Sequence, residues 1–193
     1  MRKKIINKRV LFEFVSISFA VFLGMMLNTW KEARDNSELA EKSVQNIKTE
    51  ILNNKEEVAK LLKAHKELLI TVDSLILEIK DSIKVTNRTA NMDLCLLSST
   101  SWETAKITQA VANMNLALVT EISGIYEYQK YYDSLIKVYS QERMTSIPEE
   151  NKKDLLVKRQ VFISSIIEME ETLIIYYDDF LKSDLLAEVD TKS

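Results

Sequence analysis

Apolar residues follow two patterns along this chain of 193 residues. In residues 10–30 they form an almost continuous run with a single charged side chain, Glu13. A helix rises about 1.5 Å per residue, so a run of this length covers the hydrocarbon core of a bilayer, which is about 30 Å thick. The run therefore predicts a transmembrane helix.

Two other structures share an N-terminal apolar run, namely a cleaved signal peptide and a buried helix of a soluble domain. A cleavage site has small residues directly after the apolar core, whereas this run ends in Met25, Met26 and Leu27. Trp30 then lies where an aromatic side chain anchors a span at the membrane interface. We favour an uncleaved signal anchor, and both alternatives stay open.

The charges around the run predict its orientation. Residues 1–10 hold five basic side chains and no acidic one, whereas Lys31 and Arg34 after the run are offset by Glu32 and Asp35. By the positive-inside rule, the N-terminus stays in the cytoplasm. We expect a basic cytoplasmic tip, a transmembrane helix, a helical domain outside the cytoplasm and a C-terminal tail, at residues 1–9, 10–30, 31–185 and 186–193.

One side of the predicted span carries small and polar side chains. They recur every four residues at Ser16, Ala20, Gly24 and Asn28, and Glu13 lies on the same side. Small residues let two helices approach closely, and Ser or Asn side chains can form hydrogen bonds across the contact. We expect this column to contact another transmembrane helix.

Glu13 has three candidate roles. It lies about one turn inside the cytoplasmic end of the span, where it could reach water or pair with Arg9, and we favour this role. It could instead take part in the contact between helices, or relay protons or ions.

The second pattern begins after the span. From Val44 to Ile79 apolar residues recur at spacings of three and four, which is typical of a long helix in a bundle. Two glycines and one proline leave few turns, so we expect an all-α chain. We predict an antiparallel bundle of three long helices and one short helix, with the transmembrane helix continuing into the first of them.

Local signals mark the ends of these helices. The first should extend to about residue 84, and the spacing of Thr100 and Glu103 indicates a capping box at the start of a short helix. Asn115 suits the N-cap of the next long helix, and Ser146 begins a second capping box before the last one. This arrangement predicts a C-terminus far from the membrane.

The residues expected of a catalytic, cofactor or metal site are missing. His65, the only histidine, lies in the apolar seam, so we expect it to set helix register, with pH sensing or catalysis as alternatives. A di-iron bundle needs two Glu-x-x-His pairs, and one cysteine, Cys95, cannot build a thiolate zinc site. The acidic residues of the last helix are expected to form a solvated face, with weak binding of divalent cations as the alternative, at positions 168, 170, 171, 178 and 179.

Charge and aromatic content bear on partners. From residue 31 onward 28 acidic side chains outnumber 21 basic ones, which argues against nucleic acid, because its binding depends on neutralising phosphates. Tyr126, Tyr128, Tyr131 and Tyr132 cannot all point inward from one helix. Since tyrosine is enriched at protein interfaces, some of the four are a possible partner surface, with packing in the core and at its boundary as the alternative.

Four short motifs carry a family resemblance. They read NTWKEAR, SWETAK, MNLALV and IYE, at residues 28–34, 101–106, 114–119 and 125–127. With these motifs the chain resembles an uncharacterised family of small bacterial membrane proteins that is common in the Bacteroidetes. The resemblance implies one span in the bacterial inner membrane and a helical periplasmic domain, and it assigns no activity. Many relatives have a glycine shortly after the second tryptophan, where this chain has Thr108 and Gln109, so this turn is expected to differ.

Together these features favour a non-enzymatic single-pass membrane protein that acts in assembly. Its partners would be membrane lipid and protein, as a homo-oligomer or an accessory subunit of a larger complex. Two other classes stay open: a periplasmic sensor or ligand-binding bundle, and an ion-conducting or motor-associated subunit that uses Glu13.

Overall fold

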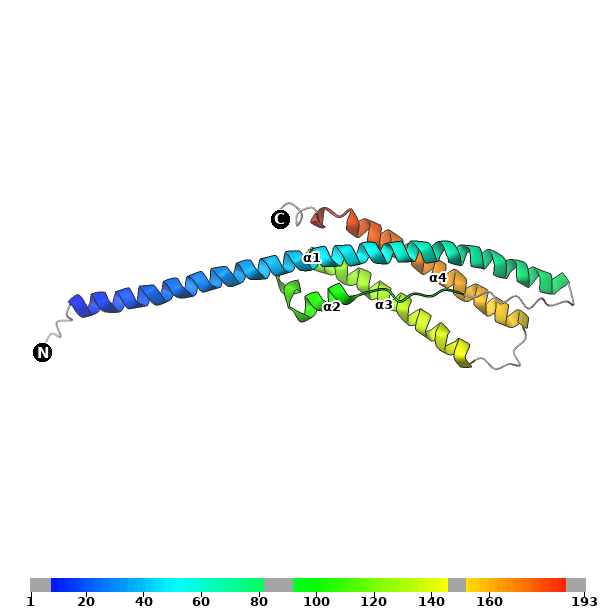
Figure 1. The fold of residues 1–193 in the computed structure, drawn as a ribbon, viewed down its shortest axis with the longest axis horizontal. Helices are drawn as coiled ribbons and strands as arrows, with labels where there is room; N and C mark the ends of the chain where they lie inside the picture. Colours follow the sequence, from blue (N-terminus) through cyan, green and yellow to red (C-terminus); the bar gives the residue numbers. More distant parts are fainter. Residues whose placement is uncertain (1–7, 82–91, 146–151, 187–193) are drawn as a thin grey trace.

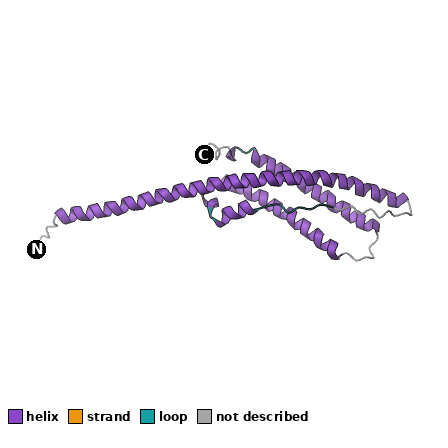
Figure 2. Cartoon of the chain, viewed as in Figure 1, coloured by secondary structure: helices purple, strands orange, loops and turns teal. Residues whose placement is uncertain are grey.

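A computed structural model of the chain describes residues 8–81, 92–145 and 152–186. These residues are helical apart from short connections, as Figure 2 shows, which confirms the all-α class. The elements are α1, α2, a 3-10 helix η1, α3 and α4, with bounds Lys8–Asp81, Thr100–Ile107, Ala110–Asn113, Leu116–Thr145 and Lys152–Leu181. Three long helices and one short α-helix are therefore present, as predicted.

Helix α1 has two parts with different surroundings. Residues 11–39 are exposed throughout, whereas burial begins at Ala40 and recurs at Val44, Ile47 and Ile51. In Figure 1 the N-terminal part of α1 projects from the bundle as one uninterrupted helix. We call the end of the bundle from which it projects the proximal end, and the opposite end the distal end.

Helix α4 packs against α1 along the bundle and runs in the opposite direction. Its contacts with α1 show this: Lys55 Nζ lies 2.5 Å from Asp178 Oδ1, whereas farther along α1, Gln160 Nε2 donates to Asp73 Oδ1 at 2.7 Å. Helix α3 packs on α4 as well. The core that the helices share is filled by aliphatic and aromatic side chains, of which the largest fully buried ones are Tyr132, Tyr177, Phe180, Ile47, Ile51, Leu118 and Ile122.

The chain returns from the distal to the proximal end between α1 and α3. Residues 92–99, which we call the return segment, have no regular secondary structure and lie along α1 (Figure 1). Ser98 is bonded to Asn54 of α1 and to Gln129 of α3, so the segment connects these two helices. Helix α3 consequently begins at the proximal end and runs parallel to α1.

This path corrects the predicted position of the C-terminus. Helix α3 runs from the proximal to the distal end, so α4 runs back to the proximal end (Figure 1). Its C-terminal end contacts Lys55 of α1 through Asp178, and Ser183 beyond it donates to Glu121 near the start of α3. The prediction was wrong because it treated residues 85–98 as a local connection, whereas the described part of this stretch crosses the bundle.

The predicted helix starts had different outcomes. Asn115 is confirmed as a cap, because its Oδ1 accepts a hydrogen bond from the amide of Ala117 at 2.8 Å. The capping box at Thr100 is wrong: the N-cap is Ser99, which makes no side-chain cap bond, and the amide of Ser101 donates instead to Glu50 Oε2 of α1 at 2.9 Å. The capping box at Ser146 lies outside the described residues.

The turn between α2 and η1 contains a strained residue. Gln109 has φ 59° and ψ 15°, the left-handed region that favours glycine, whereas Thr108 before it has φ −80°. A residue with a Cβ adopts this conformation at a cost of about 1 kcal/mol or more. The turn therefore uses a conformation for which Gln109 is poorly suited.

We expect Gln109→Gly to raise the free energy of unfolding by about 0.5 to 1 kcal/mol, because the strain disappears and offsets the greater freedom of the unfolded chain. Thr108→Gly is the matched control. It should lower stability by about 0.5 kcal/mol or more, since Thr108 already has right-handed backbone angles, so glycine adds flexibility there and also removes the hydrogen bond from the Thr108 hydroxyl to the Thr104 carbonyl. Thermal unfolding of both variants followed by circular dichroism measures the difference, and equal effects would contradict the assignment of strain to Gln109.

Candidate functional site

Buried polar side chains run through the apolar bundle. Among the described residues the buried polar set is Ser43, Glu50, Asn54, His65, Gln129 and Glu170. Most of these side chains make hydrogen bonds to the return segment or to groups that contact it. The physical reason is that a non-helical segment packed along a helical bundle has backbone amides and carbonyls without partners in secondary structure, and leaving them unpaired is costly.

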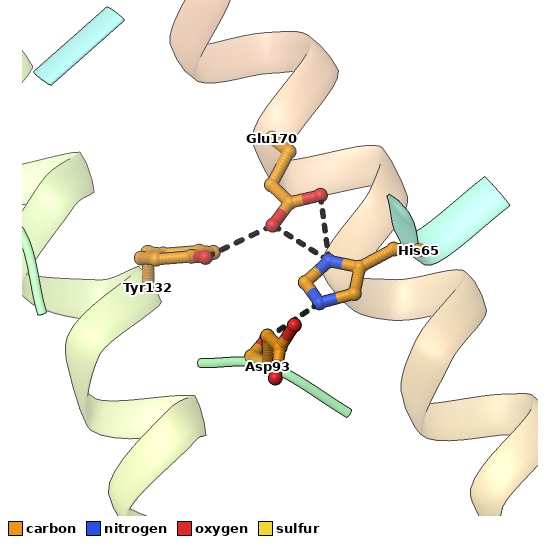
Figure 3. A network of polar contacts seen from close by, with 4 residues as sticks. All are labelled: His65, Asp93, Tyr132 and Glu170. Carbon is orange, nitrogen blue, oxygen red and sulfur yellow. Dashed lines mark hydrogen bonds and ion pairs between the residues drawn. The ribbon is translucent and has the colours of Figure 1, made fainter. Parts of the chain in front are cut away.

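His65 lies at the centre of the distal group of these contacts (Figure 3). Its Nδ1 is 2.9 Å and 3.0 Å from the two carboxylate oxygens of Glu170 on α4. Its Nε2 is 2.8 Å from the backbone carbonyl oxygen of Asp93 in the return segment. The hydroxyl of Tyr132 on α3 donates to Glu170 Oε1 at 3.0 Å. Four segments of the chain thus meet at one carboxylate and one imidazole.

The partners of His65 indicate its protonation state. A carbonyl oxygen can only accept, so Nε2 must carry a hydrogen, and the Glu170 carboxylate is an acceptor for a hydrogen on Nδ1. An imidazole with two such neighbours is protonated. Burial by itself lowers the pKa of His65, but the hydrogen bond and charge of Glu170, with help from Asp93, outweigh it and raise this pKa above its ordinary value of 6.5.

Tyr132 keeps its proton in this group. Burial first, and then the charge and hydrogen bond of Glu170, raise the pKa of the Tyr132 hydroxyl well above its ordinary value. The hydroxyl is therefore a permanent donor to Glu170.

Asn54 and Gln129 form the middle group, around Ser98. Asn54 donates to the carbonyl of Ser98 at 2.7 Å and accepts from the Ser98 amide at 3.1 Å. Gln129 donates to the same carbonyl at 2.8 Å and accepts from the hydroxyl of Tyr177 at 3.0 Å. The two amide side chains thereby replace the backbone partners that a neighbouring strand would supply.

Glu50 lies at the centre of the proximal group. Its carboxylate accepts hydrogen bonds from the Tyr126 hydroxyl at 2.6 Å, the Ser98 hydroxyl at 2.7 Å and the Ser101 amide at 2.9 Å. The ring of Tyr126 stacks on Trp102 of α2, with centroids 5.9 Å apart. A negative side chain at the start of a helix is favourable, so Glu50 joins α1, the return segment and α2.

The four tyrosines predicted as a possible partner surface divide into two pairs. Tyr126 and Tyr132 are buried, with hydroxyls bonded to Glu50 and Glu170, so these two pack in the core and are not part of an exposed surface. Tyr128 is half-buried and Tyr131 is 61% exposed. The reason is helical geometry: residues 126, 129 and 132 share the inward face, and 128 and 131 lie on its flank.

Glu170 is the site residue that sequence reasoning missed. It was expected on a solvated acidic face, yet it is fully buried, whereas Glu168, Glu171 and Asp179 are exposed as predicted. A signal was present, because position 170 follows Ile166 by four residues and precedes Leu173 by three, in line with the apolar stripe.

The buried groups show no reaction chemistry of their own. Both nitrogens of His65 are bonded and its ring is buried, so it has no free atom to offer a substrate. Within the described ranges, no group of three His, Cys, Asp or Glu side chains could hold a metal ion. The geometry suits holding the return segment in place and binding a proton.

The apolar part of α1 is the second candidate site. It is the one helix in the described part of the chain that is long and apolar enough to cross a membrane, and its apolar window is not buried by the rest of the chain. Arg9 Nε lies 3.5 Å from Glu13 Oε1, so the pairing favoured for Glu13 is present. Ser16, Ala20 and Gly24 are exposed, and a Cβ on Gly24 would meet no atom within 4 Å.

The C-terminal end of this apolar part is polar on one side. Asn28 Nδ2 donates to Glu32 Oε1 at 2.7 Å, a contact within the helix, and Trp30 is exposed beside it.

The structure describes a helical protein with one candidate membrane-spanning helix near its N-terminus. Comparison with models of protein families, with curated proteins and with solved structures finds no match. The resemblance to a bacterial membrane family stays a prediction.

Proposed function

We propose that this is a non-enzymatic, single-pass protein of the bacterial inner membrane that acts in assembly, as a homo-oligomer or as an accessory subunit of a larger complex. The observation that carries the proposal is the complete exposure of residues 11–30, which include Phe12, Phe14, Phe22 and nine other large apolar side chains besides Trp30. Burying that much apolar surface is strongly favourable, so these residues need a cover that the chain itself does not provide.

Lipid and a second helix would each cover part of this surface. Lipid suits the opposite side, which carries Phe14, Phe22 and Met25. The column of Ser16, Ala20, Gly24 and Asn28 suits a helix. Gly24 supports this division, because no other part of the chain approaches it. With the basic tip in the cytoplasm, the bundle would lie in the periplasm.

The continuity of α1 would transmit such a contact to the bundle. Residues 31–39 are exposed but remain helical, so α1 passes from the apolar part into the core without a break. Charged side chains support this stretch, since Lys42 Nζ lies 2.6 Å from Glu38 Oε1 and Arg34 acts on Glu38 as well. Spans that associate in the membrane would therefore bring their bundles side by side.

The Arg9 pair bears on the ion-conducting alternative. A carboxylate that relays ions must be free to exchange its partner, whereas Glu13 already has a guanidinium one turn away on its own helix. Assembly through the small-residue column is thus the better supported of the two proposals.

We expect Gly24→Leu to weaken or abolish assembly, because a leucine side chain keeps the helix backbones apart. Native mass spectrometry of the protein purified in mild detergent measures the oligomer and any partner that co-purifies. Phe22→Leu is the matched control, since it changes an apolar side chain away from the column and should leave assembly intact. A protein that is monomeric and free of partners before any substitution would contradict the proposal.

A further inference from the structure

The pair of His65 and Glu170 differs from the other buried polar groups because His65 can change its charge near neutral pH. Asn54 and Gln129 carry no titratable group, and burial raises the pKa of the Tyr177 hydroxyl beside Gln129 well above the neutral range. Histidine is the side chain whose ordinary titration falls in that range, and this chain has a single one. The effect of the His65 proton on the bundle can therefore be measured separately from the effects of the other buried polar groups.

We propose that His65 and Glu170 form a proton-binding site that makes the bundle sensitive to pH, and that loss of the proton releases residues 92–96 of the return segment from α1. This function goes beyond assembly and does not depend on it.

The geometry determines which bond is lost. When the imidazolium gives one proton to water, the neutral ring keeps a hydrogen on only one nitrogen. The charge of Glu170, with both oxygens within 3.0 Å of Nδ1, retains the hydrogen there. Nε2 then presents a lone pair to the carbonyl oxygen of Asp93, 2.8 Å away, and two acceptors repel each other. The contact between α1 and the return segment at Asp93 is the one that fails.

Other contacts confine the opening to the first half of the return segment. Ser98 stays bonded to Asn54 and Gln129, and the Leu97 amide donates to Asp133 Oδ1 at 3.4 Å. None of these groups involves His65. Residues 92–96 lie beyond them. The Asp93 carbonyl therefore loses its hydrogen bond to α1, whereas Ser98 keeps its bonds.

The groups that face His65 from each element make the direction of the effect clear. They are Glu170 from α4, Tyr132 from α3 through Glu170, and Asp93 from the return segment, with Asp133 and Cys95 acting on Tyr132. Lys66 and Glu171, the next residues on α1 and α4, pair with each other at the surface, 2.6 Å apart. Glu170 faces the imidazolium of His65 directly, which makes His65 the positive partner of this carboxylate.

The sign of the pH dependence follows from the raised pKa of His65. The folded state keeps its proton to a higher pH than the unfolded state, whose histidine titrates near 6.5. The stabilisation is complete below that pH and is lost as the pH rises through the folded-state pKa. Between the two values, the equilibrium constant for unfolding rises about tenfold per pH unit.

The decisive experiment is a nitrogen NMR titration of the full chain in detergent micelles with labelled histidine. The single residue gives an unambiguous signal, and its two nitrogen shifts distinguish the imidazolium from both neutral tautomers. We expect an imidazolium that persists above pH 6.5 and then converts to the tautomer with hydrogen on Nδ1. A neutral ring at pH 6.5 or below, or the other tautomer, would overturn the proposal.

Carbonyl chemical shifts test the structural consequence in a sample that is also labelled with carbon-13. The backbone carbonyl of Asp93, which accepts from Nε2, should change its shift across the His65 titration, and the Ser98 amide should keep its protection from hydrogen exchange. A constant Asp93 carbonyl shift, or loss of protection at Ser98 in the same pH range, contradicts the mechanism.

Two variants separate proton binding from a merely structural role. Glu170→Gln keeps an acceptor for Nδ1 but removes the charge, so the His65 titration and the release of residues 92–96 should both shift to lower pH. Glu171→Gln, the exposed neighbour, should shift neither. If Glu170→Gln fails to fold, His65→Gln provides the test, because the Asp93 carbonyl shift should then no longer change near neutral pH.

Discussion

Glu50→Ala is expected to lower the free energy of unfolding by about 3 kcal/mol, since it leaves buried donors without their charged acceptor. The donors are the hydroxyls of Tyr126 and Ser98 and the amide of Ser101. The loss is large for a domain whose total stability is on the order of 5–15 kcal/mol. It should appear as a lower midpoint of thermal unfolding and as early loss of the near-ultraviolet signal of Trp102, which stacks on Tyr126.

Two variants show whether the effect belongs to this carboxylate. Glu56→Ala removes an exposed carboxylate from the same helix and should change stability by less than about 0.5 kcal/mol. Glu50→Gln keeps the size of the side chain and one acceptor, so its effect should lie between the two. If Glu50→Ala and Glu56→Ala unfold at the same midpoint, the hydrogen bonds that Glu50 accepts at the start of α2 do not contribute to the free energy of unfolding.

Deletion of residues 1–39 should transfer the protein completely from the membrane fraction to the soluble fraction. The thirteen large apolar side chains from Leu11 to Trp30 are exposed on the chain, and none belongs to the core. The same deletion should leave the unfolding midpoint of the remaining bundle within a few degrees of the full chain, because burial begins at Ala40.

A single substitution tests whether membrane association depends on the apolar character of residues 10–30, with the segment still present. Val21→Arg places a charge in the middle of the apolar run, which costs about 2.5–3.5 kcal/mol in a bilayer, and should reduce membrane association of the otherwise intact chain. Fractionation and alkaline extraction of membranes measure both changes. A shortened protein that still sediments with membranes, or that unfolds much earlier, would show that the segment belongs to the bundle.

Local features of the fold could be predicted because they depend on residues close together in the sequence. The long helix follows from the spacing of residues such as Val44 and Ile47, the cap at Asn115 involves the amide of Ala117, and Arg9 reaches Glu13 over one turn. For each of these, the backbone of one helix brings the partners together.

The path of the return segment could not be predicted in this way. It has no periodic pattern, and its position depends on bonds to α1 and α3 that span 44 and 31 residues. Two wrong predictions follow from this segment. It places the start of α3 at the proximal end, so α4 also ends there, and it brings α2 to Glu50, which accepts from the Ser101 amide in place of the predicted capping box.

The sequence by itself determined that the chain is helical, that its N-terminal run is long and apolar enough to span a membrane, and that polar residues interrupt the apolar seam at Asn54 and His65. Only the tertiary structure decided what those polar residues do. His65 meets Glu170 across 105 residues, and no spacing rule connects positions that far apart. The physical reason is the unpaired backbone of the return segment: it requires buried partners, and the folded bundle alone determines which side chains reach it.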